Sequence, residues 1–434
     1  MPDFIFRLPL DNQLTDAQRI ALEYDTSIVI SGGPGSGKTV VTINRFLIPV
    51  KNNKDAMLFT YNRTLLASIK GLLRAKSEEI FGELNETAIN QVIQNKIASF
   101  SKYYGGIVYH EEIAVGEKFK RFIINRGGVK YTEIFFDEAQ DLTPAVFAKA
   151  FVLSEKISCG ADNAQNLQGN FPPDEAVEII LNNLNNQQPT DLQQLEANFR
   201  NTKEIFEFAR SLVPDDENVQ NIDTSELSNG EKPEVLDNLN NSEQLNKIIE
   251  IIQNNPTNNI GILVNYSNQV TEIKQYLESN GYSSKANVLD NISFSYYFNG
   301  MPYEDEQVMF NRMKTPFIVT YDSCKGLEFD IVIMPFFNDA FRALDKPRPL
   351  KIKNADGRWV NALNADGSFI YENNADGTTK MWATRNHYYV GATRARTILY
   401  ILCNVRPSIL SFYNNDSINQ NNQSNLFILD DLPF

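Results

Sequence analysis

Histidine and cysteine are scarce in this 434-residue chain, which contains two histidines and three cysteines. The cysteines lie far apart, form no CxxC pair and show no zinc-ligand spacing with the histidines, so the sequence predicts neither a disulfide framework nor a zinc site. There is no run of about 18 apolar residues. Residues 1–7 also lack the long apolar core of a signal peptide. We therefore expect a cytoplasmic protein that does not cross a membrane.

An excess of positive charge is also missing, because 40 Lys and Arg face 54 Asp and Glu and the net charge is −14. This balance argues against a surface coated for non-specific nucleic-acid binding, although a local basic groove can exist inside an acidic envelope. The length is sufficient for two or three domains with their own cores.

Short apolar runs alternate with amphipathic segments along most of the chain. Strands are predicted at 28–30, 57–61, 134–136, 157–160, 260–264, 317–320, 331–334 and 398–402. Strands that alternate with helices indicate parallel sheets in an α/β fold. Asp, Asn, Glu and Ser dominate residues 213–242, which we interpret as a linker between domains at 1–212 and 243–434.

The sequence Asn-Ala-Asp-Gly occurs three times, starting at 354, 364 and 374. Asp-Gly suits tight turns, because glycine adopts positive φ without steric penalty. We predict a small β-meander inserted at 345–384. A calcium-binding loop is the alternative, but the spacing lacks the pattern and terminal Glu of an EF-hand.

The segment Gly32-Gly-Pro-Gly-Ser-Gly-Lys-Thr39 matches the phosphate-binding loop G-x-x-x-x-G-K-[ST] in full. In such a loop, backbone N–H groups cradle phosphates, the lysine reaches the β- and γ-phosphates, and the hydroxyl of the last residue contacts Mg²⁺. The alternative is a glycine-rich hairpin, which the flanking strand and helix disfavour. The predicted ATP-binding residues are Gly33, Gly35, Ser36, Gly37, Lys38 and Thr39.

A second motif, Ile134-Phe-Phe-Asp-Glu-Ala-Gln-Asp141, places two carboxylates at the end of an apolar strand. Asp137 is the candidate Mg²⁺ ligand beside Thr39, and Glu138 is the candidate general base for the attacking water. An isolated acidic pair after a strand is usually a solvated turn, but a preceding phosphate-binding loop favours the catalytic interpretation.

The order of these motifs resembles that of superfamily 1 helicases of the UvrD/Rep/PcrA type, from about residue 14 to residue 402. Three further segments carry the resemblance in the first half: Leu14-Thr-Asp-Ala-Gln-Arg19, Ala161-Asp-Asn-Ala-Gln165 and Leu195-Glu-Ala-Asn-Phe-Arg200. The resemblance implies two RecA-like domains that bind ATP and Mg²⁺. It also implies that Gln18 contacts adenine, Gln165 senses the γ-phosphate, Phe199 stacks on adenine and Arg200 acts as an arginine finger.

In the second half, residues 319–329 are similar to T-x-H-S-A-K-G-L-E-F, and residues 389–396 to Y-V-[AG]-x-T-R-A-[RK]. The resemblance implies that Glu328 contacts the ribose and that Arg394 reaches the γ-phosphate across the cleft. Arginines from two domains would make cleft closure depend on ATP.

The nucleic-acid side of the resemblance is less complete, because Asp322 replaces a histidine and Phe171 stands near the place of a tryptophan. Phe59 and Phe100 are either base contacts or core residues. The residues that the resemblance assigns to nucleic acid are Phe59, Thr60, Asn62, Phe100, Thr320 and Lys325.

The short spacing between the motifs leaves little room for the accessory insertions of these helicases. We therefore expect a compact motor that hydrolyses ATP and moves along single-stranded nucleic acid, with DNA favoured, beside a partner protein such as a nuclease or effector in anti-phage defence. The alternative is an ATP-driven regulatory switch in a larger complex, with the β-meander as its docking surface.

Overall fold

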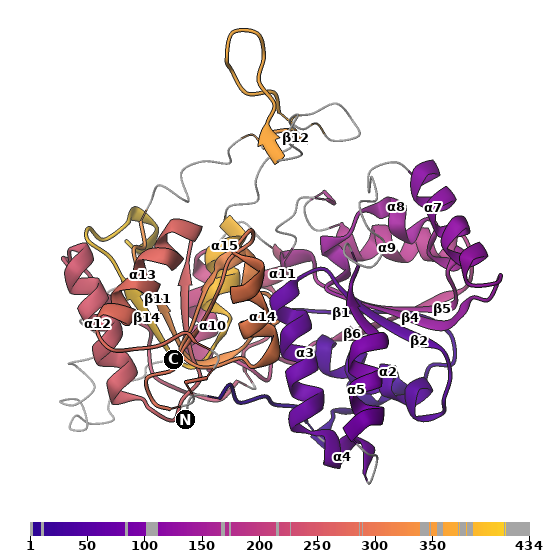
Figure 1. Cartoon of the computed structure of the whole chain (residues 1–434), viewed down its shortest axis with the longest axis horizontal. Helices are drawn as coiled ribbons and strands as arrows, with labels where there is room; N and C mark the ends of the chain where they lie inside the picture. The colour runs from indigo at the N-terminus through magenta and orange to yellow at the C-terminus, as the bar shows by residue number, and fades with distance from the viewer. Residues whose placement is uncertain are drawn as a thin grey trace, which may run out of the picture.

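The computed structural model describes residues 3–9, 13–82, 86–100, 112–165, 170–172, 175–213, 217–225, 227–285, 287–288, 290–338, 347, 349–353, 359–371, 373, 379, 385–411 and 413. These residues form two lobes that lie side by side (Figure 1). Each lobe is built on a six-stranded sheet in which every strand pair is parallel. The predicted α/β fold with two parallel sheets, as in paired RecA-like domains, is confirmed.

The first lobe (residues 13–195) has the strand order β3-β2-β4-β5-β1-β6. Its strands are β1 Ser27–Gly32, β2 Ala56–Thr60, β3 Ile97–Ser99, β4 Tyr131–Asp137, β5 Ser154–Ala161 and β6 Thr190–Leu195. Its helices are α1 Asp16–Glu23, α2 Lys38–Lys51, α3 Arg63–Ala75, α4 Ser77–Phe81, α5 Glu86–Asn95, α7 Glu112–Asn125, α8 Pro144–Phe147 and α9 Ala176–Asn185. Strand β2 is buried throughout, as expected of a parallel sheet covered on both faces.

The second lobe has the strand order β7-β14-β11-β8-β10-β9. Its strands are β7 Glu234–Leu236, β8 Ile260–Val264, β9 Ser295–Tyr297, β10 Phe317–Thr320, β11 Phe329–Met334 and β14 Ala395–Leu402. Its helices are α10 Lys203–Ser211, α11 Glu217–Gln220, α12 Asn241–Asn254, α13 Ser267–Ser279, α14 Tyr303–Asn311 and α15 Arg385–Ala392.

Four strands were not predicted, and all lie toward the edges of the two sheets. Helix α5 ends at Asn95, and the next residues, Ile97–Ser99, form strand β3 and pair with β2. Strand β6 has a polar sequence because its side chains are alternately exposed. The other two strands, β7 and β9, have three residues each, too few to show a period.

The boundary between the lobes differs from the expected one. Helix α10 lies within the range 1–212 assigned to the first domain, but it packs on α15 and β14 of the second lobe. Strand β7 lies within the expected linker 213–242 and is an edge strand of the second sheet. The chain therefore crosses between the lobes at residues 196–202, which we call the crossover loop.

The N-terminal residues 3–8 form a second connection, which we call the strap. The Ile5 N–H and C=O groups bond to the side chain of Asn259 in the second lobe, at 2.9 and 2.8 Å. Phe4 lies in the core of that lobe, whereas Phe6 also packs against Gly71 of α3 in the first lobe. The strap therefore contacts both lobes.

The described residues 349–353 and 359–371, which lie within the insertion expected at 345–384, project away from both lobes (Figure 1). Strand β12, Lys351–Lys353, pairs antiparallel with β13, Trp359–Asn361. The second repeat forms a turn in which Gly367 has φ +84° and Gly367 N–H donates to Asn364 O. The repeats at 354–357 and 374–377 lie outside the described residues. Within the described part of the chain, no helix has both the length and the apolar character needed to cross a membrane.

Candidate nucleotide site between the lobes

The phosphate-binding loop connects β1 to α2 and has the expected geometry. Gly35 and Gly37 have φ of +77° and +89°, a region that favours glycine. A Cβ at Gly35 would also collide with the side chain of Asn198. Lys38 is buried, and its Nζ donates to Gly32 O at 2.6 Å, Gly33 O at 2.9 Å and Asp162 at 3.1 Å. The loop therefore holds its ammonium group at the mouth of an anion cradle.

The two candidate Mg²⁺ ligands lie together, with Asp137 at the end of β4 and Thr39 at the start of α2. Thr39 Oγ1 is 3.3 Å from Asp137 Oδ1. Burial, followed by the charge of Glu138, raises the pKa of Asp137 to about 7. Among the described residues, the buried Asp137 Oδ2 has no hydrogen-bond partner. A hydroxyl and an unsatisfied carboxylate fit Mg²⁺, which usually takes one or two carboxylates, waters and substrate phosphates.

Glu138 has a strained backbone, with φ 55° and ψ 50° in the left-handed region. Few non-glycine residues adopt this conformation, and those that do cluster at functional sites. Burial alone would raise the pKa of Glu138, but the charges of Lys325, Lys38 and Arg394 outweigh it and hold the pKa below its usual value. Glu138 is therefore present as a carboxylate, the form that a general base requires.

A chain of polar contacts leads from Glu138 to the second lobe. Gln140 Nε2 donates to Glu138, and Gln140 Oε1 accepts from the Asp162 N–H at 3.2 Å. Gln165 Nε2 donates to Asp162 at 2.6 Å, and its Oε1 accepts from Arg394 Nη2 at 3.1 Å. Gln165 thus joins the first lobe to Arg394 of the second lobe.

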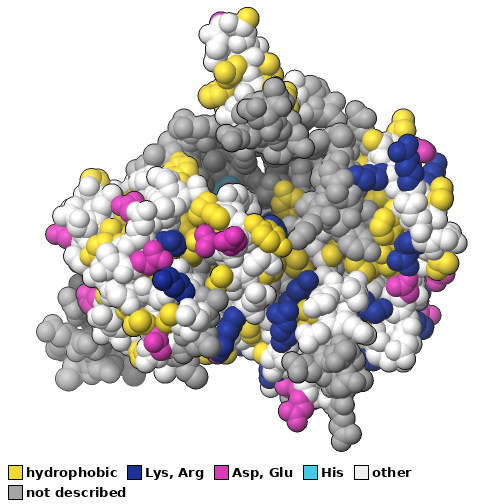
Figure 2. Space-filling view, in the orientation of Figure 1, with side chains coloured by type: hydrophobic (Ala, Val, Ile, Leu, Met, Phe, Trp, Pro, Cys, Tyr) yellow, Lys and Arg dark blue, Asp and Glu magenta, His cyan; other side chains and the backbone are white. Residues whose placement is uncertain are grey.

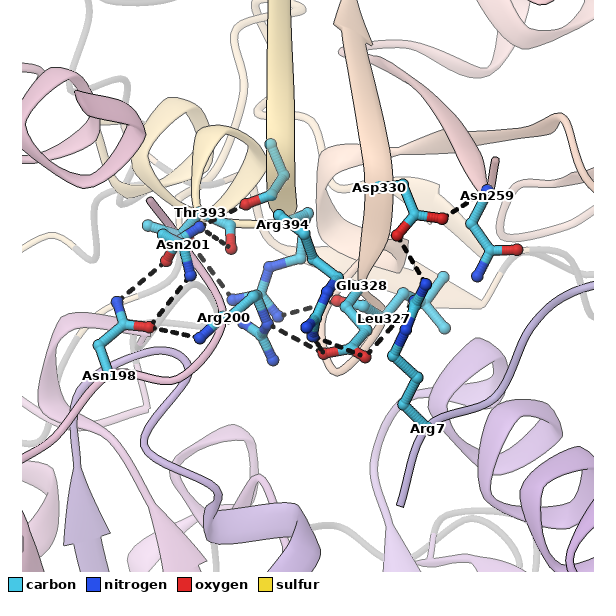
Figure 3. Close-up of polar contacts among 12 residues, drawn as sticks. Arg7, Asn198, Arg200, Asn201, Asn259, Leu327, Glu328, Asp330, Thr393 and Arg394 are labelled. Atoms are coloured by element: carbon cyan, nitrogen blue, oxygen red, sulfur yellow. Dashed lines mark hydrogen bonds and ion pairs between the residues drawn. The ribbon is translucent and has the colours of Figure 1, made fainter. Parts of the chain in front are cut away.

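The two predicted arginines lie side by side in the cleft (Figure 3). Burial, and next the charge of Arg394, lower the pKa of Arg200 to about 10. Arg200 Nε forms an ion pair with Glu328 Oε2 at 3.5 Å, and the buried Arg200 Nη1 has no hydrogen-bond acceptor within the described part of the chain. Buried donors without acceptors are costly, so this site favours an anionic ligand.

Three more of the predicted ATP residues border the same space. Phe199 has 52% of its surface exposed. Gln18 completes a capping box with Thr15 at the start of α1, and its Nε2 donates to Ser36 O in the phosphate-binding loop at 2.9 Å. Glu328 faces Arg396 at 3.3 Å and Arg200 at 3.5 Å.

These residues line one cavity of about 600 Å³ between the lobes. Its walls include Gln18, Gly35, Gly37, Lys38, Thr39, Glu138, Gln165, Phe199, Arg200, Glu328 and Arg394. A volume of this size suits a small ligand such as a nucleotide. The cavity brings together residues that are far apart in the sequence, as the motifs predicted.

The structure corrects the residues assigned to nucleic acid. Phe59 and Phe100 are fully buried and contact each other edge to face, with ring centroids 5.4 Å apart. Neither ring offers a face to a base, so both belong to the core alternative. Phe171 is also buried, next to Phe147.

The four polar residues of that set are buried as well. Thr60 donates to Asn62 O at 3.0 Å, and Asn62 caps α3 and donates to Asp322 O across the lobes at 3.1 Å. Thr320 ends strand β10. Lys325 forms an ion pair with Asp141 at 2.6 Å. Asn62 and Lys325 therefore join the lobes in this conformation, and all four side chains are at most 8% exposed.

Three residues at this site, Asn198, Asn201 and Arg7, were not predicted from the sequence. Asn198 and Asn201 flank Arg200 in the crossover loop, and Arg7 of the strap contacts Asp330 at 2.7 Å and lies 4.0 Å from Glu328. Asn198 lies within the motif Leu195–Arg200, so the motif could have identified Asn198 as a site residue. Nothing in the sequence pattern linked Arg7 to this site.

The fold and cavity define a two-lobed, helicase-like protein with a phosphate-binding loop at the lobe interface. Residues 25–404 match the family model of the Schlafen group 3, DNA/RNA helicase domain, and the chain belongs to this family. The chain is therefore a member of a helicase family, as the motifs predicted. The closer relationship to UvrD/Rep/PcrA-type helicases stays a prediction.

Among solved structures, the chain is similar to the C-terminal domain of a possible DNA helicase from Lactobacillus plantarum, with 14% identity over 51% of this chain and 96% of that one and a TM-score of 0.30. It is also similar to the helicase of PRRSV, with 13% identity over 92% of this chain and 55% of that one and a TM-score of 0.34. No curated protein matches the chain.

Proposed function

We propose that this chain binds and hydrolyses ATP with Mg²⁺ and moves along single-stranded nucleic acid, with DNA favoured. The observation that carries the proposal is the cavity between the lobes, where Arg200 lies near the phosphate-binding loop and its buried Nη1 has no acceptor among the described residues. A triphosphate supplies the anionic oxygens that such donors require.

In this mechanism, backbone N–H groups of the loop and Lys38 bind the β- and γ-phosphates. Mg²⁺, held by Thr39 and Asp137, would neutralise charge on these phosphates. Glu138 accepts a proton from the water that attacks the γ-phosphorus, and ADP leaves. Arg200 and Arg394 stabilise the charge on the transferred phosphoryl group, so hydrolysis requires a closed cleft.

Movement along a strand follows from the second role of the cleft. Each cycle of closing and opening changes the distance between the lobes, and a strand held by both lobes would be advanced. Figure 2 shows Lys and Arg side chains on α3 and α7 of the first lobe, despite the acidic net charge. Such local basic surface supports a phosphate-backbone contact.

The test is ATPase activity with and without defined single-stranded DNA and RNA. We expect stimulation by single strands, stronger with DNA, and its loss in Glu138→Gln with ATP binding retained. The matched control is Glu155→Gln, the same change at an exposed residue at the start of β5. Full activity without nucleic acid, together with no oligonucleotide binding at low salt, would rule out translocation.

A regulatory switch is the second candidate, favoured by the burial of all six residues assigned to nucleic acid. In this case, ATP closes the cleft and a partner protein, such as a nuclease or effector in anti-phage defence, reads the closed form. The arm at 345–384 is the candidate docking surface. Deleting it would abolish partner binding and leave ATPase activity intact, whereas a motor would keep its nucleic-acid stimulation independently of any partner.

A further inference from the structure

The crossover loop is anchored to both lobes on either side of Arg200. On the first-lobe side, Phe199 N–H donates to Gly35 O in the phosphate-binding loop at 2.9 Å. On the second-lobe side, the side chain of Asn201 reaches the backbone around Arg394. The predicted arginine finger therefore lies at the point where the chain passes from one lobe to the other.

Asn201 makes an unusual pair of contacts. Its Nδ2 donates to Thr393 O at 3.1 Å and to Ala395 O at 2.5 Å, so its two bonds bracket Arg394 (Figure 3). Only 3% of Asn201 is exposed. Buried hydrogen bonds of this kind fix one geometry, because a lost partner leaves the carbonyls unsatisfied.

Asn198 fixes the orientation of the Asn201 amide. Asn198 Nδ2 donates to Asn201 Oδ1 at 3.0 Å, and Asn198 Oδ1 accepts from the N–H groups of Arg200 at 2.8 Å and Asn201 at 3.3 Å. A flipped Asn201 amide would point its oxygen at two carbonyl oxygens and its NH₂ at another NH₂. The contacts allow one arrangement, in which Asn201 is donor to the second lobe and acceptor from the loop.

We propose that Asn201 is a positioning residue that fastens the loop carrying Arg200 to the segment carrying Arg394, so that the two guanidinium groups enter the cleft as one unit. The inference rests on the proposed ATP hydrolysis, and it assigns to Asn201 no contact with the nucleotide. We call the two hydrogen bonds from Asn201 to Thr393 O and Ala395 O the clamp. The clamp is needed because the guanidinium groups of Arg200 and Arg394 are buried and carry like charges, so they repel each other and would separate without it.

The consequence is specific to the transition state. Ground-state ATP is held mainly by the phosphate-binding loop, which Asn201 does not touch. The transferred phosphoryl group needs both arginines in place, and a displacement of about 1 Å can lower the rate about a hundredfold. Loss of the clamp should therefore lower kcat and leave KM for ATP nearly unchanged.

The experiment compares Asn201→Ala and Asn201→Asp with wild type and with the control Asn182→Ala, an exposed residue of α9. We expect kcat to fall about ten- to a hundredfold in Asn201→Ala, with KM for ATP within about threefold. Asn201→Asp should lose more, because a carboxylate would face two carbonyl oxygens. Both variants should lose the preference for ADP with aluminium fluoride over ADP alone, since the former mimics the transition state.

A double-variant cycle separates positioning from a general effect on folding. If Asn201 acts through Arg394, then Asn201→Ala should change little in an Arg394→Ala background. Two results would overturn this inference but leave the proposed function standing. One is a wild-type kcat in Asn201→Ala, and the other is a joint fall of kcat, ADP affinity and melting temperature in that variant. Absence of ATPase activity in the wild-type protein would overturn the proposed function and this inference with it.

Discussion

The buried ion pair between Lys325 and Asp141 gives the sharpest test of how the lobes are held together. Lys325 Nζ lies 2.6 Å from Asp141 Oδ1, the two residues come from different lobes, and each side chain is only 1% exposed. Burial raises the pKa of Asp141 to about 6, although Lys325 opposes this shift. The carboxylate is therefore tolerated mainly because the ammonium group is next to it.

Replacing Lys325 with Met should leave a buried, uncompensated carboxylate at pH 8. Breaking a buried ion pair costs about 3–5 kcal/mol. Opening the lobes relieves this cost, because Asp141 then reaches water. We expect Lys325→Met to shift the protein to an open form at pH 8.

The effect should reverse in acid. Without Lys325, the pKa of Asp141 in the closed form rises above 6, while the hydrated group stays near its usual 3.8. A raised pKa favours the closed form at low pH, and this stabilisation is lost as pH rises through the raised pKa. Between pH 8 and pH 5 the difference is at most about 4 kcal/mol, at about 1.4 kcal/mol per pH unit.

Energy transfer between dyes on the two lobes would measure the opening. Ile124→Cys in α7 and Tyr266→Cys before α13 are exposed labelling sites, and the three native cysteines are buried. The control is Lys325→Met with Asp141→Asn, which removes the charge and should stay closed at both pH values. Wild-type energy transfer in Lys325→Met at pH 8, or equal opening in the double variant, would refute the reasoning.

Three further predictions follow from single contacts. Phe59→Ala and Phe100→Ala should each lower the free energy of unfolding by about 3–5 kcal/mol in chemical denaturation, because both rings are in the core; a loss of nucleic-acid affinity with unchanged stability would contradict this placement. Gly35→Ala should abolish nucleotide binding in calorimetry, because the new Cβ meets Asn198 at a positive φ; retained affinity would count against the loop geometry. Asn259→Ala removes both bonds to Ile5 and should speed tryptic cleavage after Arg7 in the strap, whereas an unchanged rate would show that the strap is held by other contacts.

The sequence predicted the parts of the site that are local in the chain. The phosphate-binding loop and the carboxylates at 137 and 138 each lie within one strand and the turn that follows, so a short pattern fixes both residue type and geometry. The arginines and Gln165 were placed by resemblance, and the structure brings them to the same cavity.

The parts that were wrong depend on contacts between distant segments. Phe59 follows the same apolar pattern whether its ring faces a groove or the core, and the rings of Phe100 and Phe136 decide the matter. Lys325 and Asp141 are 184 positions apart, so no local pattern reveals their pairing. The spacing of the apolar residues in α10 shows that one face of the helix is apolar, but it does not show on which lobe that face packs.

The two connections between the lobes explain why the boundary matters for function. The crossover loop carries Arg200 through the cleft, and the strap crosses the same cavity with Arg7 beside Glu328. The strap precedes the matched range 25–404, so the family resemblance alone would not include it. Because Phe4 is held in one lobe and Phe6 packs on the other, any opening of the cleft must move the strap as well as the loop. Lobe movement in this chain is therefore constrained at two points that both border the nucleotide cavity.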